Sequence, residues 1–377
     1  MNAGADRPLR VAVIGCGGMA LGGHLPIALS MPDKYSVVAV ADRSPERLRS
    51  AAELAQLDER GQHIDAATVI ADPEIDAVVI ATPPHARAGI AVSALRSGKH
   101  VLCEKPLAIT AAAATEAVSA AAEAGRCLAM VHNYLFLPEI VAVNNSIAAG
   151  DVGEVRLVTI NALGVCDNPG ASEYNWRHDA AVAGGGVLMD MLHLVYLAEK
   201  LVGRPFEKVS AYVDAEEAGA GVESLALCRF ETLRSAALVN LGWGMGPGGL
   251  VVTGTKGRVE VRYENGGTSP FSPLKTVELV DDVGQRSIEV GGTTSPLRSI
   301  WTDFYKSVKN NGQPIADGAD GLRALEAVLG AYASAALERT VQLPLDATDP
   351  VFLEGVAGIR SYKVNERSVL VRKGLYT

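Results

Sequence analysis

The alternation of short apolar runs with helical segments over residues 1–132 constrains the fold more than any other feature of the chain. Ser44, for example, is placed to cap a helix over 44–57, between two of the runs. Strands that are apolar throughout and alternate with helices indicate a parallel, doubly wound sheet covered on both faces. The predicted strands are 10–15, 35–42, 75–82 and 100–105.

The pattern changes after about residue 135, where strand-like stretches follow one another with short turns. Most of the gaps are too short for crossover helices, so these strands are predicted to be antiparallel. The stretches are 154–163, 207–215, 222–231, 234–244, 249–264 and 275–282; the predicted helices are 184–203, 295–312 and 318–340. We therefore expect an α/β protein with a Rossmann dinucleotide-binding domain at 1–132. An α+β substrate-binding and oligomerisation domain with a broad, mostly antiparallel sheet is expected at 133–377.

Length, charge and cysteine usage narrow the class of protein. A chain of 377 residues is long enough for two such domains. A net charge of −9 argues against nucleic-acid or anionic-membrane partners, since both need basic surface. We find no signal-peptide pattern and no apolar run of about 18 residues that would span a membrane. The five scattered cysteines form no CxxC pair, so a cytoplasmic protein without disulfides is expected.

A glycine-rich turn follows the first predicted strand and precedes a helix. In it, Gly15 permits a tight turn, Gly17 lets the backbone approach a pyrophosphate, and the small Ala20 allows the helix to pack closely on the strand. Gly18 and Met19 complete the turn, and the N–H groups at the start of the helix are free to bind phosphates. The turn is therefore a candidate dinucleotide site.

Asp42 ends the second predicted strand, where a carboxylate can bind both ribose hydroxyls of NAD and repel a 2′-phosphate. We therefore expect NAD as the cofactor, and the neighbouring Arg43 leaves NADP as the alternative. A plainer interpretation of Asp42 is a solvated acid that caps the helix over 44–57.

Four more residues lie at the carboxyl ends of the third and fourth predicted strands, where ligands bind in open α/β sheets. Thr82 and Pro83 lie at the end of the third strand, and Glu104 and Lys105 lie at the end of the fourth. Pro106 restricts the backbone of Lys105 to an extended conformation, so Lys105 is a stronger candidate than an ordinary solvated lysine.

The segment 184–203, "GGGVLMDMLHLVYLAEKLVG", is apolar on nearly every side but carries Asp190 and His193. Both groups are costly to bury without partners. They are either a satisfied polar pair in the core or active-site groups. A metal site is not predicted, because only two ligands occur at this spacing.

Several motifs together resemble the glucose-fructose oxidoreductase / inositol dehydrogenase / rhizopine catabolism (Gfo/Idh/MocA) family, over a span that ends at "VQLP" (341–344). The motifs are the glycine turn, "HLP" (24–26), "TPP" (82–84), "GKHVLCEKPLA" (98–108), "NYLFLPE" (133–139), "GDVGEV" (150–155), "NWR" (175–177), the "GGG" helix and "DGADGLRALEAVLGAYASA" (317–335). The resemblance implies an NAD(P)-dependent oxidoreductase that transfers a hydride between nicotinamide and a secondary alcohol or ketone of a sugar, cyclitol or glycoside.

The resemblance also implies roles for individual residues. Lys105 would bond the substrate oxygen, His193 would accept or return the proton, and Asp190 would orient a substrate hydroxyl or tune the other two. Glu104 would brace the site. The candidate substrate-binding residues are Asn133, Tyr134, Trp176 and Arg177.

The resemblance leaves other functions open. One alternative is an NAD-retaining enzyme that cleaves glycosides by transient oxidation and elimination, and a minor one is a sugar sensor without catalysis. A homodimer or homotetramer is expected by resemblance only.

Three features depart from the family pattern. Asp190 and His193 are three residues apart instead of four, so either the His approaches from a shifted angle or the helix start is wound differently. Leu135 stands where an arginine is common, which favours a less anionic sugar. The residues after Pro344 extend past the usual end, and we expect them to form an arm or added strand at a subunit contact. The glycines 184–186 are expected to leave room for the substrate.

Overall fold

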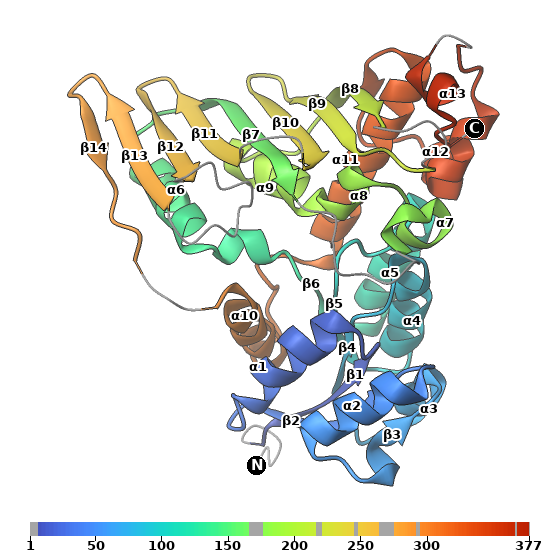
Figure 1. Ribbon diagram of the computed structural model, residues 1–377. Helices are drawn as coiled ribbons and strands as arrows, with labels where there is room; N and C mark the ends of the chain where they lie inside the picture. The colour runs from blue at the N-terminus through green and yellow to red at the C-terminus, as the bar shows by residue number, and fades with distance from the viewer. Residues whose placement is uncertain are drawn as a thin grey trace. The chain divides into compact units, whose positions relative to one another are not determined.

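The computed structural model describes residues 7–165, 176–215, 221–244, 248–263, 275–291, 295–365 and 368–376 (Figure 1). The chain divides into two compact units. The first unit comprises Met1–Ala108, Ala113–Asn133 and Ser295–Leu322, and the second comprises Ile109–Ala112, Tyr134–Thr294 and Arg323–Thr377.

The first unit contains a six-stranded parallel sheet in the order β3-β2-β1-β4-β5-β6. Its strands are β1 (Leu9–Ile14), β2 (Tyr35–Ala41), β3 (Gln62–His63), β4 (Ala77–Ile80), β5 (His100–Cys103) and β6 (Leu128–Met130). This order is that of a Rossmann fold and confirms the predicted doubly wound sheet. The outer strands β3 and β6 were not predicted, because each is too short to give an apolar run.

Helices flank this sheet. They are a π-helix (Ala20–His24) that continues into α1 (Leu25–Leu29), α2 (Pro45–Ala55), α3 (Ala66–Ala71), α4 (Pro84–Arg96), α5 (Ala111–Ala124) and α10 (Pro296–Asn310). The Ser44 side chain caps α2 by accepting a hydrogen bond from the Arg47 N–H, as predicted. Gly98, which follows α4, has a φ of +78°, a conformation that favours glycine and ends the helix.

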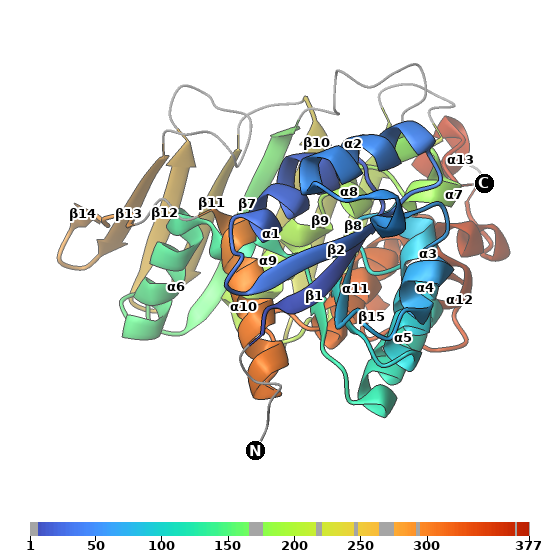
Figure 2. The same ribbon diagram turned by 90° about the horizontal axis from the view of Figure 1, so that it is seen from below.

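Helix α10 differs from the prediction, which placed 295–312 in the second domain. It lies beside α1 in the first unit (Figure 2). The reason is Trp301, which is fully buried and packs edge-on against Tyr35 with ring centroids 4.7 Å apart. The Tyr35 hydroxyl also donates to the Trp301 carbonyl over 2.5 Å. A helical pattern in the sequence shows which face of a helix is apolar, but it does not show which domain core that face packs against.

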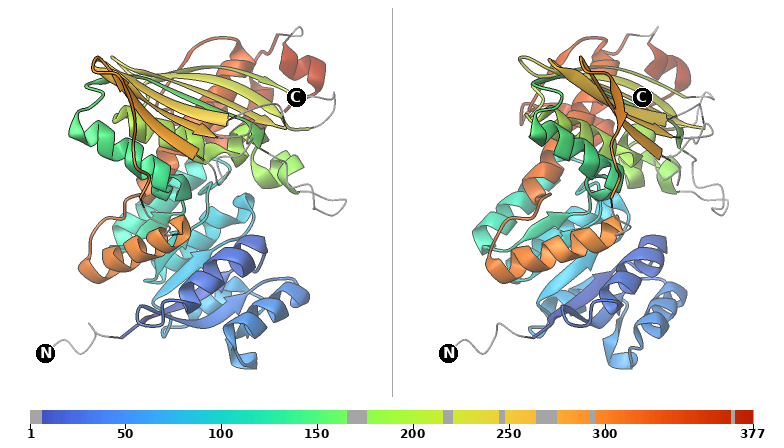
Figure 3. Two further views of the ribbon diagram at one scale, coloured as in Figure 1. Left: turned by 60° about the vertical axis from the view of Figure 1, so that its left-hand side comes forward. Right: turned by 90° about the vertical axis from the view of Figure 1, so that its left-hand side faces the viewer.

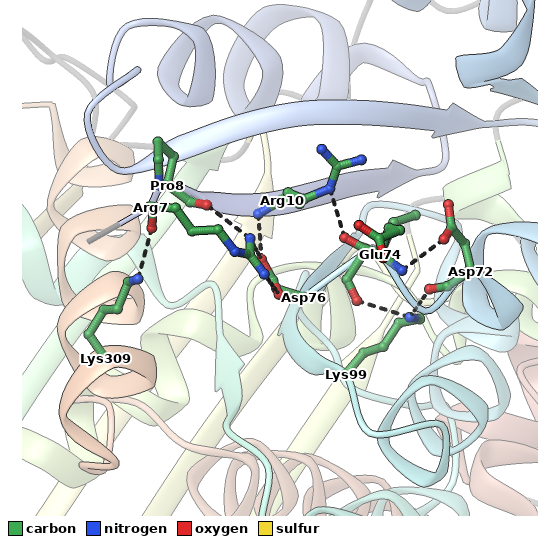
Figure 4. A network of polar contacts seen from close by, with 9 residues as sticks. Arg7, Pro8, Arg10, Asp72, Glu74, Asp76, Lys99 and Lys309 are labelled. Atoms are coloured by element: carbon green, nitrogen blue, oxygen red, sulfur yellow. Dashed lines mark hydrogen bonds and ion pairs between the residues drawn. The ribbon is translucent and has the colours of Figure 1, made fainter. Parts of the chain in front are cut away.

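A polar network joins the start of β1 to α10 (Figure 4). The Asp76 carboxylate accepts two hydrogen bonds from the Arg7 guanidinium, at 2.6 and 2.8 Å, and one from the Arg10 N–H at 2.8 Å. Lys309 of α10 donates to the Arg7 carbonyl over 2.9 Å. These contacts lie at the amino ends of β1 and β4, opposite the carboxyl ends where ligands bind in this fold.

The second unit is built on a nine-stranded sheet in the order β14-β13-β12-β11-β7-β10-β9-β8-β15. Its strands are β7 (Val155–Val165), β8 (Lys208–Asp214), β9 (Leu225–Glu231), β10 (Ala236–Trp243), β11 (Gly248–Gly254), β12 (Gly257–Tyr263), β13 (Lys275–Asp281), β14 (Gln285–Ser287) and β15 (Val341–Gln342). Only the β7–β10 pair is parallel within this described sheet, so the mostly antiparallel prediction is confirmed.

Helices cover one face of this sheet (Figure 3). Helix α9 (Leu192–Val202) packs on β7 and β10, and α6 (Pro138–Ala149) packs on β12 and β13. Side chains along β9 alternate between buried and exposed, as expected for a sheet with one covered face. The remaining helices are α7 (Ala180–Ala183), α8 (Val187–Asp190), α11 (Gly318–Leu337), α12 (Pro350–Glu354) and α13 (Val369–Lys373), with 3₁₀ turns at Asn133–Phe136, Trp176–His178 and Gly355–Ser361.

The prediction of a single helix over 184–203 is wrong. The structure breaks it at Met191 into α8 and α9. No single helix in the described ranges is long and apolar enough to span a membrane. The helical pair Ala180–Asp190 and Leu192–Val202, bent by 44°, meets that length and composition test when taken together.

Candidate active site

The glycine turn has the backbone that a close approach to a phosphate requires. Gly15 has a φ of +92°, and a Cβ there would lie 2.7 Å from the backbone of Ala81 and Thr82, so only glycine fits. A Cβ on Gly17 or Gly18 would meet nothing within 4 Å. The turn therefore packs tightly on its β4 side and leaves open space beside Gly17 and Gly18.

Asp42 ties this turn to the end of β2. One carboxylate oxygen accepts from the Cys16 N–H over 2.7 Å, and the other accepts from the Ser44 N–H over 2.8 Å. The plainer interpretation, contact with the start of the 44–57 helix, therefore holds in part. A carboxylate has about four acceptor sites, so two remain for a ribose. Arg43, beside it, is exposed.

The loops that follow β4 and β5 are clamped by Arg87 of α4, a residue that the sequence did not single out. Its Nε donates to the Thr82 carbonyl over 2.8 Å, and one terminal nitrogen donates to the carbonyls of Lys105 and Pro106. Arg87 is buried. The signal that the sequence offers for it is an arginine three residues after "TPP", in the first turns of a helix rich in small and apolar residues.

Glu104 is held by a buried chain of hydrogen bonds. The Trp301 indole N–H donates to His24 Nδ1 over 3.2 Å, and an indole N–H can only donate, so Nε2 carries the His24 proton. That nitrogen lies 3.1 Å from a Glu104 oxygen, and the Lys105 N–H donates to the other oxygen. Burial raises the pKa of Glu104, but the His24 hydrogen bond and the charges of Arg87 and Lys105 outweigh it, so the net shift is downward.

These residues of the first unit fit a dinucleotide. Gly17 and Gly18 leave room for a pyrophosphate against bare backbone, and Asp42 has acceptor sites for ribose hydroxyls. The buried Thr82 Oγ1 has no hydrogen-bond partner within the described part of the chain, and neither does Asn133 Oδ1. Buried polar atoms without partners are uncommon in folded proteins, and a bound cofactor can supply the missing partners.

In the second unit, three of the predicted residues form a chain of contacts from Asp190 through Arg177 to Trp176. The Arg177 Nε lies 3.4 Å from an Asp190 oxygen. The same guanidinium stacks over the Trp176 ring, 4.6 Å from its centroid. Arg177 and Asp190 both stay partly exposed, so their remaining polar atoms can contact a bound molecule.

His193 lies against Tyr134, the other predicted substrate residue of this unit. The two rings meet edge to face with centroids 4.8 Å apart. Tyr134 belongs to the 3₁₀ turn Asn133–Phe136 and is 3% exposed, and His193 is 8% exposed. The imidazole is therefore oriented by an aromatic neighbour from a distant part of the sequence.

The break at Met191 accounts for the unusual spacing. Asp190 is the last residue of α8, and His193 is in the first turn of α9, so one regular helix does not relate them. The structure therefore shows a differently wound helix start, one of the two explanations considered.

The three glycines before α8 make room for protein atoms, whereas we expected room for the substrate. A Cβ on Gly184 would lie 2.8 Å from Ile109 Cγ2, one on Gly185 would overlap the Tyr332 hydroxyl, and one on Gly186 would overlap the Glu223 carbonyl oxygen. The Glu223 carboxylate accepts from the N–H groups of Gly186 and Leu188.

The predicted site residues thus form two groups. In the first unit are the glycine turn with its exposed Met19 and buried Ala20, Asp42, Arg43, Thr82, Pro83, Glu104, Lys105 and Asn133. In the second unit are Tyr134, Trp176, Arg177, Asp190 and His193. No cluster of three or more His, Cys, Asp or Glu side chains that could hold a metal ion occurs within the described residues.

A parallel sheet in this strand order with an open glycine turn defines a dinucleotide-binding protein. Residues 9–132 match the family described as "Oxidoreductase family, NAD-binding Rossmann fold", and residues 145–343 match its "C-terminal alpha/beta domain". The chain belongs to this Gfo/Idh/MocA oxidoreductase family and has an NAD-binding Rossmann domain.

Named relatives include sugar and cyclitol enzymes. The chain is 29% identical to 1,5-anhydro-D-fructose reductase of Ensifer adhaerens over 73% of this chain and 82% of that protein. It is 37% identical to inositol 2-dehydrogenase 1 of Saccharopolyspora erythraea over 40% and 44% of the two chains. A levoglucosan dehydrogenase, solved with NADH and levoglucosan, superposes with a TM-score of 0.79 at 23% identity, over 90% of this chain and all of that one, and shows the shared fold.

Proposed function

We propose that this protein oxidises a secondary alcohol, or reduces the corresponding ketone, of a sugar, cyclitol or glycoside, with NAD as its cofactor. The observation that carries the proposal is the Asp190 and His193 group, in which polar side chains lie among the aromatic rings of Trp176 and Tyr134. Aromatic faces beside hydrogen-bonding groups suit the apolar faces and hydroxyls of a sugar ring. The relatives named for anhydrofructose and inositol support this substrate class.

NAD, when bound, supplies the nicotinamide that takes up or returns the hydride. Gly15, Gly17, Gly18, Met19 and Ala20 form its pyrophosphate cradle in this proposal. Asp42 binds the ribose and excludes a 2′-phosphate, with Arg43 beside it. Thr82, Pro83 and Glu104 line the rest of the cofactor site.

Three side chains act on the substrate. Lys105 donates a hydrogen bond to the carbinol oxygen and stabilises negative charge that develops there. His193 takes the hydroxyl proton in oxidation and returns it in reduction, because an imidazole can act as both general base and general acid. Asp190 orients a neighbouring hydroxyl. Arg87 and Glu104 hold the backbone around Lys105, so they position it without touching the substrate.

Substrate contacts are proposed for Asn133, Tyr134, Trp176 and Arg177. Leu135 is buried and offers no charge, which favours a neutral sugar over an acidic one. Cofactor binding is proposed for residues of the first unit, and substrate contacts are proposed for Lys105 and Asn133 of the first unit as well as for residues of the second. We also infer a cytoplasmic homodimer or homotetramer.

A substrate screen followed at the nicotinamide absorbance tests the proposal. Wild-type protein, Lys105→Ala and Lys306→Ala are assayed with NAD on inositols, aldoses, anhydrosugars and glycosides. Lys306 is an exposed lysine of the same unit and is the control. We expect NADH formation with wild type and Lys306→Ala, and loss of turnover in Lys105→Ala with NAD affinity within a few-fold of wild type.

Two results contradict the proposal. Turnover that survives in Lys105→Ala removes Lys105 from its role. Glycoside cleavage without net NADH identifies the NAD-retaining elimination instead of net oxidation.

A further inference from the structure

The C-terminal segment beyond the family match is folded onto the second unit. After residue 343, where that match ends, the chain forms α12, the 3₁₀ turn Gly355–Ser361 and α13, and α13 packs on β8 (Figure 1). Leu375 and Tyr376, the last described residues, are buried. The segment therefore returns to the core of its own chain.

Tyr376 reaches the carboxylate of Glu223. Its hydroxyl donates to Oε2 of Glu223, and its ring packs edge-on against Tyr332 with centroids 5.4 Å apart. Tyr376 has a φ of +61°, a left-handed conformation that is unfavourable for an aromatic residue. Such a backbone persists only where its surroundings hold it. The position of this hydroxyl is therefore specific.

Glu223 has no exposed surface and sits at the centre of four donors. The Leu188 N–H and the Tyr332 hydroxyl donate to Oε1, each over 2.8 Å. The Gly186 N–H, over 3.0 Å, and the Tyr376 hydroxyl donate to Oε2. Through the two N–H groups, Glu223 holds the start of α8, the four-residue helix that ends at Asp190.

All four donors are needed to stabilise the buried Glu223 carboxylate. A buried carboxylate is costly unless its oxygens are hydrogen-bonded, and removing one donor leaves a buried charge less satisfied. Burial already raises the pKa of Glu223 above its ordinary value, while its hydrogen bonds from Tyr376, Leu188 and Tyr332 oppose that shift. Without the Tyr376 hydroxyl, the carboxylate either takes up a proton or moves, and both changes weaken its hold on the N–H groups of α8.

We infer that Tyr376 is a positioning residue for the reaction: it holds Glu223, which holds the start of α8 and so sets Asp190 beside Arg177. The inference rests on the proposed function, in which Asp190 orients the substrate. It gives the C-terminal segment a role inside its own chain, whereas the sequence pointed to a subunit contact.

Tyr376→Phe and Tyr362→Phe form a matched pair of variants. Each removes one phenol hydroxyl from the C-terminal segment, that of buried Tyr376 or that of half-buried Tyr362. The Tyr362 hydroxyl donates to Asp349 inside the same segment, over 2.5 Å. We expect Tyr376→Phe to speed hydrogen exchange in peptides covering 186–190 and to lower kcat about tenfold, with NAD affinity unchanged. Tyr362→Phe leaves exchange at 186–190 and kcat at wild-type values.

Tyr332→Phe, which removes the other hydroxyl from the same carboxylate, is the second variant and should show the same pattern. Wild-type exchange at 186–190 in both Tyr376→Phe and Tyr332→Phe overturns the inference. So does faster exchange with unchanged kcat, or an equal fall of kcat in Tyr362→Phe. A wild-type protein that turns over no sugar refutes the proposed function instead, and the exchange measurement still tests the Tyr376–Glu223–α8 link.

Discussion

Asp42→Asn tests the cofactor site most directly, because the Asp42 carboxylate holds two backbone N–H groups at once. One oxygen binds the Cys16 N–H of the glycine turn, and the other binds the Ser44 N–H. An asparagine side chain has one carbonyl oxygen, so its NH₂ group faces one of these donors. The variant therefore keeps the shape of the side chain but leaves one N–H without its acceptor.

The expected loss of stability and of NAD affinity follows from the one N–H group that is left without an acceptor. Leaving one partly buried N–H without its acceptor costs about 1–3 kcal/mol of unfolding free energy. If the same energy is lost from the cofactor-binding turn, the Kd for NAD rises about 5- to 150-fold, since 1.4 kcal/mol corresponds to a factor of ten. Removing the negative charge also removes its repulsion of a 2′-phosphate. The ratio of the Kd for NADP to that for NAD therefore falls.

Urea unfolding of the cofactor-free protein and fluorescence titrations with NAD and NADP measure these quantities. Asp65→Asn is the control, because Asp65 caps α3 through a single N–H, that of Ala67, and Asn caps as well as Asp. An Asp42→Asn protein with wild-type stability and wild-type Kd values would refute the reasoning. Tighter binding of NADP than of NAD by the wild type would refute the ribose assignment.

Three further predictions concern stability measured by urea unfolding. Glu104→Gln should lose about 1–3 kcal/mol, because an amide replaces the charged acceptor beside buried His24; unchanged stability would contradict the buried chain. Gly186→Ala should unfold at much lower urea, since its Cβ overlaps a backbone oxygen, whereas Gly89→Ala in open space on α4 should gain up to about 1 kcal/mol. Burial raises the pKa of Glu326 to about 7 from its ordinary 4.5, so protonated Glu326 contributes to the free energy of unfolding below pH 4.5, and this contribution is lost as the pH rises through 7. Glu326→Gln should therefore gain stability relative to wild type between pH 5 and pH 8. A constant difference in stability over that range would argue against this titration.

Much of the fold could be predicted because local patterns carry it. The longer strands of both sheets give apolar runs or alternation, and Gly15, Gly98 and Ser44 mark turns and a cap through their own local chemistry. Strands β3, β6, β14 and β15 were missed, since two or three residues give no periodic signal.

The groups that hold the candidate site could not be predicted in the same way. Arg87 acts through carbonyls on two loops, and Glu104 is held by His24 and, one hydrogen bond further away, by Trp301, which lies 277 residues from His24 in the chain. Such partners meet only when the chain is folded. The spacing of these residues in the sequence does not predict their contacts.

The sequence by itself predicted a parallel dinucleotide-binding sheet with a glycine turn over residues 1–132, because strand pattern and turn chemistry are local properties. It also singled out Asp190 and His193 as costly groups in an apolar segment. Only the tertiary structure decided why they are three residues apart, what fills the space beside the three glycines, and where the C-terminal segment lies. These outcomes depend on packing between distant parts of the chain, and above all on Glu223, whose carboxylate finds its four donors only in the folded protein.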